Sequence, residues 1–306
     1  MSVVVLGSAN LDLVYDVERI PAPGETVLAR GYGAFAGGKG NNQAVAAARA
    51  GSETRFIAAL GRDENGDRLA EEARAAGIAL LDRRVDAPTG TASIYVDRGG
   101  ENSIVVNSGA NAELTALTAT ELAAIGDADV LVLQLETPPG AVAEAARAAR
   151  AAATAVVLNA APADRRAEDL LGDVDVLVVN EHEANGLLGR DPGADLDAAV
   201  DALTAYGCTV VVTLGAAGCL VAAPGGEPVK VPAVPVPVVD TTGAGDTFVG
   251  YLAAAIDADE RHATGAAALA GAAAFATAAA AIAVQRKGAV PSIPTLEEVR
   301  GSRDAH

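Results

Sequence analysis

The sequence predicts an α/β protein built as a three-layer α/β/α sandwich, with a small second β-sheet beside it. Short apolar segments without polar alternation recur along the chain, which is typical of parallel strands covered on both faces. Alanine-rich segments with helical periodicity separate them, and strands that alternate with helices form such sandwiches. The chain has 306 residues and is 51% hydrophobic, so it can bury the large core that this architecture requires.

The strands of the main sheet are expected where Val, Ile or Leu dominate, at residues 3–7, 54–60, 130–135, 155–159, 176–180 and 209–214. Helices are expected between them at residues 41–50, 66–76, 140–152 and 196–206, and again at 248–256. Residues 229–239 form a further strand-like segment that prolines interrupt.

Two pairs of segments break the alternation of strands and helices. Residues 13–17 with 26–32, and residues 91–97 with 103–107, read as strands that no helix separates. The second pair is predicted to form a hairpin across residues 98–102. These strands can form a small separate sheet that covers a site or pairs with another copy of the chain. The alternative is that they are extra antiparallel strands at the edge of the main sheet.

The composition excludes several classes of partner. Lys and Arg total 22 against 40 acidic residues, a formal net charge of -18, so a general nucleic-acid or anionic-membrane surface is not expected. Aromatic residues make up 3% of the chain and Trp is absent, which disfavours a platform for stacking bases. Cys208 and Cys219 do not form a short-spaced metal pair, so we expect reduced thiols in a cytoplasmic protein.

No targeting segment is expected at the start of the chain, because the first apolar run lacks basic residues before it. Residues 263–284 carry no charge and are long enough to span a bilayer. Most of them are Ala, which contributes little to insertion, and Gly and Thr interrupt the run. We expect a helix packed on all sides in the core of a soluble protein.

Residues 240–248, with the sequence DTTGAGDTF, are the most informative stretch of the chain. They lie between a strand-like segment and a helical one, so the turn falls at a helix N-terminus. Free backbone N–H groups and the positive end of the helix dipole suit an anion such as a phosphate there. Asp246 would stand beside the bound anion, where its carboxylate can accept a proton. The motif predicts phosphoryl transfer to a hydroxyl group.

A glycine-rich motif, GGKGNNQ, occupies residues 37–43. It nearly completes a P-loop that begins at Gly33, but Gly40 stands where Ser or Thr would bind Mg²⁺, which argues against a Walker-type NTPase. The glycines favour close approach of a small polar ligand, and Asn42 can donate to and accept from hydroxyl groups. A glycine turn that starts a helix is the alternative.

The first predicted strand is followed by GSANLD, which lacks the G-x-G-x-x-G pattern of dinucleotide-binding oxidoreductases. Asn10 and Asp12 come just after this strand, where open α/β sheets bind ligands. An amide and a carboxylate there suit vicinal sugar hydroxyls, although both residue types also form simple turns.

Polar residues also end three other predicted strands. Glu136 follows one of them. Asn180 and Glu183 are three residues apart at a predicted helix start, where Glu183 can hold Mg²⁺ directly or through water, or can simply complete a capping box. Residues 213–218 form a glycine-containing connection between strands, which can carry a nucleotide or can be a plain turn.

Together these motifs resemble those of the ribokinase-like (PfkB) carbohydrate kinases, and the resemblance covers essentially the whole chain. It runs through residues 7–12, 37–40, 109–111, 134–136, 180–183 and 240–248, and ends at 282–292. It implies one Rossmann-like kinase domain over residues 1–306, with lid strands from about 12–36 and 91–107 that also build a homodimer.

The resemblance further implies that ATP phosphorylates D-ribose at its 5-hydroxyl, with Mg²⁺ accompanying ATP and K⁺ as an activator. Fructose, fructose 1-phosphate and nucleoside kinases belong to the same family and stay open as alternatives, as does a non-catalytic sugar sensor. Arg30 is the sole basic residue between Arg19 and Lys39, which favours a neutral sugar. Retention of Asp246 with its full glycine turn argues against a sensor.

Site residues follow from the same resemblance, position by position. Asp246 would be the base, and Gly243, Ala244 and Gly245 would form an anion hole with it. The sugar would be bound by Asn10, Asp12, Gly38, Lys39, Gly40, Asn42 and Glu136 together with Asp246. ATP would contact Asn180, Thr213, Gly215, Ala216, Gly218, Gly245 and Thr277. Glu183 would support Mg²⁺, and the monovalent cation would be bound at Asp240, Thr242, Ala283, Arg286, Gly288 and Ser292.

Overall fold

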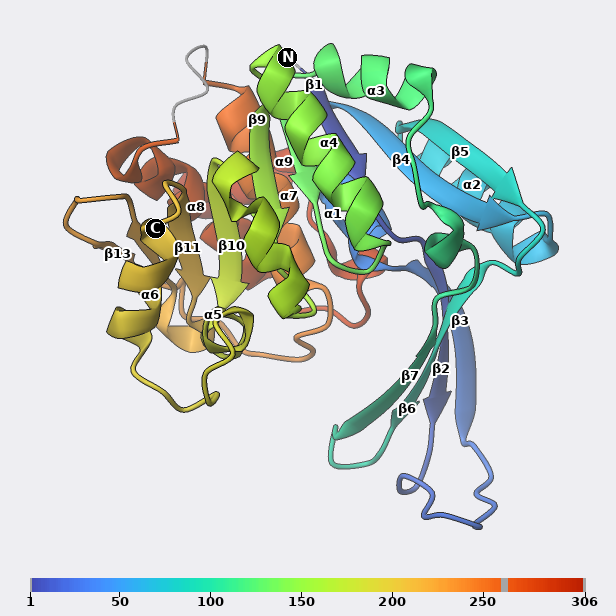
Figure 1. The fold of residues 1–306 in the computed structure, drawn as a ribbon. Helices are drawn as coiled ribbons and strands as arrows, with labels where there is room; N and C mark the ends of the chain where they lie inside the picture. Colours follow the sequence, from blue (N-terminus) through green and yellow to red (C-terminus); the bar gives the residue numbers. More distant parts are fainter. Residues whose placement is uncertain (1, 260–263, 305–306) are drawn as a thin grey trace.

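The computed structural model describes residues 2–259 and 264–304, and a nine-stranded sheet forms its centre (Figure 1). The strand order is β13-β12-β11-β10-β9-β8-β1-β4-β5. The parallel strands are β1 Ser2–Leu6, β4 Glu53–Gly61, β5 Ala79–Val85, β8 Val130–Leu133, β9 Ala155–Asn159, β10 Val176–Asn180 and β11 Thr209–Thr213. The last two, β12 Cys219–Ala222 and β13 Val229–Val231, are antiparallel.

Helices cover both faces of this sheet, which confirms the predicted three-layer architecture. Along β1, Val3 and Val5 join one core cluster, which includes residues of α1 Lys39–Arg49, α2 Glu64–Ala75, α7 Ala244–Asp257, α8 Ala266–Ala283 and α9 Leu296–Asp304. Val4 and Leu6 join the other, with α3 Ala119–Gly126, α4 Pro139–Ala152, α5 Glu181–Leu187 and α6 Leu196–Thr204. Because successive side chains of a strand point to opposite faces, an uninterrupted apolar strand contributes to both cores.

A separate four-stranded sheet in the order β3-β2-β6-β7 projects away from the main body (Figure 1). Its strands are β2 Asn10–Asp16, β3 Gly31–Gly37, β6 Gly90–Val96 and β7 Asn102–Asn107. β6 and β7 form the predicted hairpin, and β2 pairs antiparallel with β3 and parallel with β6. The alternative of extra edge strands on the main sheet is therefore wrong. The second sheet has the place of a lid, beside the ends of the main strands.

Two predicted strands lie elsewhere than expected. The strand placed at residues 26–32 is wrong, because β3 begins at Gly31 and runs directly into the glycine-rich motif. Pairing with β2 along seven residues outweighs the weak strand preference of the three glycines in β3. The strand-like segment 229–239 is a strand only at residues 229–231, because prolines further along cannot continue a ladder.

Helix α8 corresponds to the predicted apolar helix, although residue 263 lies outside the described part of the chain. By length and composition this helix could cross a membrane, and 44% of it is buried inside the molecule. It packs on α7, β12 and β13, as a core helix does. It is not packed on all sides, however, because Ala267, Ala268 and Gly271 face solvent. Such small side chains lose little by being exposed.

Four short 3₁₀ helices complete the structure of the described residues: η1 Gly109–Glu113, η2 Arg165–Asp173, η3 Gly215–Ala217 and η4 Val290–Ser292. As predicted, the connection after β11 is a tight strand-to-strand turn, with η3 inside it.

Candidate active site

Two cavities lie where the carboxyl ends of the main strands meet the base of the four-stranded sheet. The larger has a volume of about 400 Å³ and is lined from the ends of the lid strands, from η1 and from the segments after β8 and β9. The smaller, of about 230 Å³, lies under the first turns of α1, α5 and α7. Ligands bind at this edge of open α/β sheets.

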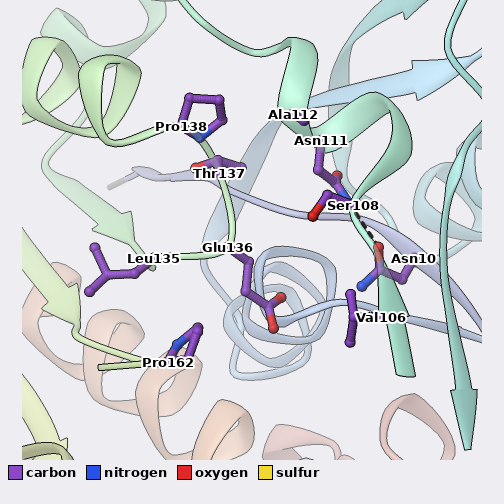
Figure 2. Close-up of a pocket in the computed structure, with 10 residues that line it drawn as sticks. All are labelled: Asn10, Val106, Ser108, Asn111, Ala112, Leu135, Glu136, Thr137, Pro138 and Pro162. Atoms are coloured by element: carbon purple, nitrogen blue, oxygen red, sulfur yellow. Dashed lines mark hydrogen bonds between the residues drawn. The ribbon is translucent and has the colours of Figure 1, made fainter. Parts of the chain in front are cut away.

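Glu136 and Asn10 are the polar side chains that face each other across the larger cavity (Figure 2). Asn10 accepts a hydrogen bond at Oδ1 from Asn111 Nδ2, at 2.8 Å. Asn111 in turn accepts a bond at Oδ1 from the backbone N–H of Ala9, at 2.9 Å. Because Asn111 holds Asn10 by its oxygen, the amide N–H₂ group of Asn10 is left to donate to a ligand. The remaining walls are mostly apolar, so a few polar groups would orient a small ligand.

Glu136 is tied to the glycine-rich motif. Its Oε2 accepts hydrogen bonds from Ser8 Oγ at 2.5 Å and from the backbone N–H of Lys39 at 3.0 Å. That N–H is one of the first in α1, and such groups have no partner within their own helix. Gly38 precedes the helix with a φ of 86°, and a Cβ there would meet Asn10 N at 2.9 Å. Glycine thus lets the α1 turn approach the backbone at the start of β2.

The smaller cavity is built around the start of α7. Gly243 is the N-cap, in the left-handed region with a φ of 74°, and Gly245 and Asp246 follow in the first turn. All three line the cavity with Lys39 and Glu183. The free N–H groups and dipole of the helix start make this a binding place for anionic oxygens, and Lys39 adds a cation.

Asp246 is 8% exposed and both of its oxygens are hydrogen-bonded. Oδ2 accepts from Asn42 Nδ2 and Oδ1 accepts from Gln43 Nε2, both at 2.9 Å. A buried carboxylate requires such donors to offset the loss of water. Asn42 Oδ1 is itself buried without a hydrogen-bond partner among the described residues.

The electrostatics of the site are dominated by carboxylates. Burial, followed by repulsion from Glu136 and Asp246, raises the pKa of Asp12 to about 7. Burial also raises the pKa of Glu183. For Lys39, burial lowers the pKa, but attraction to Asp246, Glu136 and Glu183 outweighs it, so the pKa is raised and the side chain stays charged. A site of this kind can bind hydroxyl groups and hold anionic phosphates beside one fixed cation.

Comparison with known proteins agrees with this geometry. The family model described as "pfkB family carbohydrate kinase" matches residues 1–296. The chain belongs to the PfkB family of carbohydrate kinases.

Individual relatives of this PfkB kinase point the same way. A ribokinase of Haemophilus influenzae is 39% identical over 304 residues, which cover 97% of this chain and 96% of that protein. The structure of Arabidopsis thaliana ribokinase complexed with ribose and ATP matches with a TM-score of 0.86 and 33% identity, over 98% of this chain and 97% of that one. The chain spans 55% of a bifunctional ribokinase/ribose-5-phosphate isomerase A of Fructilactobacillus sanfranciscensis, at 38% identity.

In this PfkB kinase the predicted sugar-site residues lie in and beside the two cavities, with Asp246 in the smaller one. Asn10 and Glu136 line the larger cavity, and Gly38 and Gly40 lie at the start of α1. Asn42 and Asp12 line neither cavity. Asn42 is linked to the site by its hydrogen bond to Asp246. Asp12 is close enough to Glu136 and Asp246 for their charges to raise its pKa. Lys39 belongs to both parts of the site. Its backbone N–H donates to Glu136 of the larger cavity, and Lys39 itself lines the smaller cavity.

The residues predicted for ATP divide into two groups. Asn180, Thr213 and Gly245 line the smaller cavity. Gly215, Ala216 and Gly218 lie in the turn of η3, outside both cavities, and Thr277 is buried on α8, its Oγ1 4.0 Å from Cys219 Sγ. Cys219 directly follows Gly218, so its contact with Thr277 places α8 beside the η3 turn. The residues of this second group therefore lie next to one another. Asn180 and Glu183 also form a full capping box, so the structural alternative for this pair is present.

The predicted cation residues lie on two segments that a hydrogen bond joins. Asp240 Oδ2 accepts from the backbone N–H of Gly288 at 2.8 Å, and Oδ1 accepts from Thr242 N and Oγ1 at 2.9 and 2.7 Å. Burial raises the pKa of Asp240, but these bonds outweigh it and the pKa is lowered. The guanidinium of Arg286 is paired with Glu298, and Ser292 Oγ donates to the Ala289 carbonyl.

Three contacts of the site were not predicted from sequence. Gln43, Asn159 and Ser8 contact Asp246, Gln43 and Glu136, respectively. Asn159 carried a usable signal, because it is a polar residue that ends an apolar strand. Gln43 and Ser8 carried a weaker signal. Each lies inside a motif in which neighbouring residues indicate ligand binding more directly.

Proposed function

We propose that the enzyme transfers the γ-phosphoryl group of ATP to the 5-hydroxyl of D-ribose, giving D-ribose 5-phosphate and ADP. The observation that carries this proposal is the place of Asp246. It lines the anion-binding cavity at the start of α7 and is hydrogen-bonded to Asn42 of the glycine-rich motif. Relatives described as ribokinases, one of them in a structure with ribose and ATP, support the choice of substrates.

The sugar lies in the larger cavity between Asn10 and Glu136 and extends toward Asp246 in the smaller one. Its hydroxyl groups would then come within reach of Asp12, Asn42 and the backbone of residues 38–40. The charge pattern of the lid favours a neutral sugar. Arg30 is paired with Asp16 and Glu18, and Arg19 with Glu25. These paired arginines would have to leave their partners to bind a phosphorylated sugar.

ATP directs its phosphates to the start of α7 and to Lys39, with Asn180 and Thr213 beside them. The rest of the nucleotide extends toward Gly215, Ala216 and Gly218, with Thr277 on the adjoining helix. The whole chain acts as one kinase domain, and the four-stranded lid closes over the sugar to exclude water that would otherwise accept the phosphoryl group.

In the reaction, the oxygen of the sugar hydroxyl attacks the γ-phosphorus and Asp246 accepts the hydroxyl proton. The bond between the γ-phosphorus and the bridging oxygen breaks, and ADP leaves with that oxygen. The N–H groups of Gly243, Gly245 and Asp246 stabilise charge on the transferring group, because helix-start donors are fixed before the reaction begins. The predicted contribution of Ala244 is not available in this structure, since its N–H donates to the Thr241 carbonyl oxygen at 3.2 Å. Positioning and charge stabilisation account for most phosphoryl-transfer catalysis. Asp246 therefore needs good geometry more than high basicity.

Mg²⁺ accompanies ATP in this proposal. Glu183 fits such a role because this acidic residue lines the anion-binding cavity. Among the described residues, no group of three or more His, Cys, Asp or Glu is arranged to hold a metal. That fits Mg²⁺ held largely by phosphate oxygens and water, with Glu183 behind the water. The ion would neutralise phosphate charge.

K⁺ activation is proposed for the segments that Asp240 joins. An ionised carboxylate beside neutral oxygens suits a monovalent cation, and Asp240 is held near Gly288 of the second segment. The carbonyls of Ala283, Arg286 and Gly288 and the side chains of Thr242 and Ser292 would supply the remaining oxygens. This site adjoins the anion-binding turn, since Thr242 precedes Gly243.

We also propose a cytoplasmic homodimer that forms through the lid. Tyr32, Ile104 and Val105 are 61%, 52% and 62% exposed on the lid strands, and a second copy would cover them. β7 is an edge strand, which can pair with another chain. ATP as the phosphoryl donor and the two buried free thiols agree with a cytoplasmic location.

An ADP-release assay over ribose, deoxyribose, fructose, fructose 1-phosphate and adenosine, with and without K⁺, tests the proposal. We expect ribose to have the highest kcat/KM and K⁺ to increase its turnover. A higher kcat/KM for another substrate would assign a different kinase activity. No ADP release with any of them would favour a sugar sensor.

A further inference from the structure

Gln43 lies at the centre of a buried amide network beneath Asp246. Its side chain is fully buried. Nε2 donates to Asp246 Oδ1 at 2.9 Å and to Asn159 Oδ1 at 3.0 Å, and Oε1 accepts from Gln134 Nε2 at 2.7 Å. Both hydrogens of the amide nitrogen are therefore used, and the amide oxygen has a donor of its own.

The direction of this network is fixed by the backbone. Asn159 Nδ2 donates to the carbonyl of Val178 at 3.2 Å, so Asn159 Oδ1 must face Gln43. If the Gln43 amide were turned over, its oxygen would meet two acceptors and its nitrogen would meet the donor of Gln134. The chain of bonds thus leaves one orientation, in which a Gln43 N–H faces the carboxylate of Asp246.

Asp246 is held from two sides by neighbouring residues of α1. Asn42 and Gln43 each supply one N–H, one to each oxygen. Neutral donors fix the carboxylate without neutralising its charge. Each oxygen retains a lone-pair direction for the proton of the substrate.

The bracing residues come from separate strands of the main sheet. Gln134 follows β8, and Asn159 ends β9. Gln134 is fully buried and Asn159 is 8% exposed, so neither is a solvent-facing residue. The two residues at the strand ends therefore hold the side chain of Gln43 on α1, and Gln43 in turn holds Asp246. Displacement of a reacting group by about 1 Å can cost ~10²-fold in rate, so such bracing has a catalytic consequence.

We propose that Gln43, braced by Gln134 and Asn159, is a positioning residue that holds Asp246 in the orientation needed to accept the proton of the sugar hydroxyl. The proposal rests on the role of Asp246 as the base of the proposed kinase reaction. It predicts that Gln43 acts through Asp246 and has no effect on turnover when that base is absent.

A double-mutant cycle on the full-length protein tests this. Gln43→Met keeps a similar length without hydrogen bonds, and we expect kcat to fall ~10- to 100-fold, with KM for ribose and ATP changed by less than ~3-fold. When Asp246 is already Asn, Gln43→Met should change the residual kcat by less than ~2-fold, because interacting residues are non-additive. Circular dichroism and thermal melting confirm that each variant is folded.

Gln134→Met provides the second variant. It removes the hydrogen bond from Gln134 to Gln43 Oε1 but leaves the bonds that Gln43 donates to Asp246 and Asn159. We therefore expect a smaller fall in kcat than in Gln43→Met, and no fall when Asp246 is already Asn. This variant carries the test if Gln43→Met does not fold. The inference is overturned if kcat of folded Gln43→Met stays within ~2-fold of the parent, or if its loss persists in full without the base.

The same experiment separates this inference from the proposed function. A normal kcat for Asp246→Asn alone would refute the base, and with it the kinase mechanism. A low kcat for Asp246→Asn together with a normal kcat for Gln43→Met and for Gln134→Met would refute only the positioning role.

Discussion

Asn42 Nδ2 donates a 2.9 Å hydrogen bond to Asp246 Oδ2, although the two residues are 204 positions apart in the sequence. The bond joins the first turn of α1 to the first turn of α7, and so brings the glycine-rich motif and the DTTGAGD motif into one site. The remaining polar atom of the amide, Asn42 Oδ1, is buried and unpaired among the described residues. A ligand hydroxyl would satisfy it, because buried acceptors normally have partners.

Asn42→Ala removes this acceptor and one donor to Asp246. We expect KM for ribose to rise ~10-fold, because the sugar loses one hydrogen bond to a buried acceptor, with KM for ATP little changed. Steady-state kinetics with each substrate varied in turn measures this. Asn102→Ala, at an exposed position at the start of β7, is the matched control and should leave both constants unchanged. An unchanged KM for ribose in Asn42→Ala would contradict the sugar role.

Asp12 makes sugar binding depend on pH. Its pKa of about 7 is high because of burial and the nearby carboxylates, so it is ionised above that pH and protonated below it. Only the ionised form offers all of its lone pairs to sugar hydroxyls. KM for ribose should therefore rise as the pH falls through about 7. Asp12→Asn should bind ribose more weakly and lose this pH dependence, and a variant profile like that of the parent would disprove the assignment.

Glu183→Gln separates a metal role from a capping role. Glutamine at this position still accepts the Asn180 N–H of the capping box, so thermal stability should be preserved. The negative charge behind the metal is lost, and we expect the Mg²⁺ concentration for half-maximal activity to rise about 10-fold. Titration with MgCl₂ at fixed ATP measures it. If that concentration is unchanged and Glu183→Ala merely lowers the melting temperature, the residue is only a helix cap.

Gly250 sets the distance between α1 and α7. A Cβ there would lie 2.4 Å from the Cβ of Ala46 and 2.6 Å from the carbonyl oxygen of Gln43. Gly250→Ala should destabilise the fold by ~1–3 kcal/mol, as overpacking does, and lower kcat by moving Asn42 and Gln43 relative to Asp246. Chemical denaturation and kinetics check both effects.

The matched control is Gly271→Ala on α8, where a Cβ would meet no atom within 4 Å. This variant should be as stable as the parent or up to ~1 kcal/mol more stable, because alanine favours the helix. Equal effects of the two substitutions would contradict the proposed close packing of α1 on α7.

Patterns of local origin were predictable from the sequence. The core strands are uninterrupted apolar runs, and the antiparallel hairpin of β6 and β7 follows from its turn. Asp246 and Asn42 could be selected because glycine motifs surround them. β5 Ala79–Val85 was not predicted, since Asp82, Arg83 and Arg84 interrupt it. These side chains pair with one another and with Asp67 and Glu121, so the strand tolerates its charges at the sheet edge.

Non-local contacts could not be predicted in the same way. The shift of β3 to Gly31–Gly37 depends on its register with β2, which no property of residues 26–37 alone specifies. The network of Gln43, Gln134 and Asn159 joins residues up to 116 positions apart. Each of these residues is an ordinary polar side chain in its own segment, and only the packing of α1 against the strand ends brings them together.

The role of Asp246 as base is tested most directly by measuring kcat for ribose in Asp246→Asn beside its affinity for ADP. We expect the variant to fold and bind ADP like the parent, while kcat falls by at least ~10²-fold, the lower end for a positioned general base. A kcat near that of the parent in the folded variant would contradict the role of Asp246 and the phosphoryl-transfer mechanism built on it.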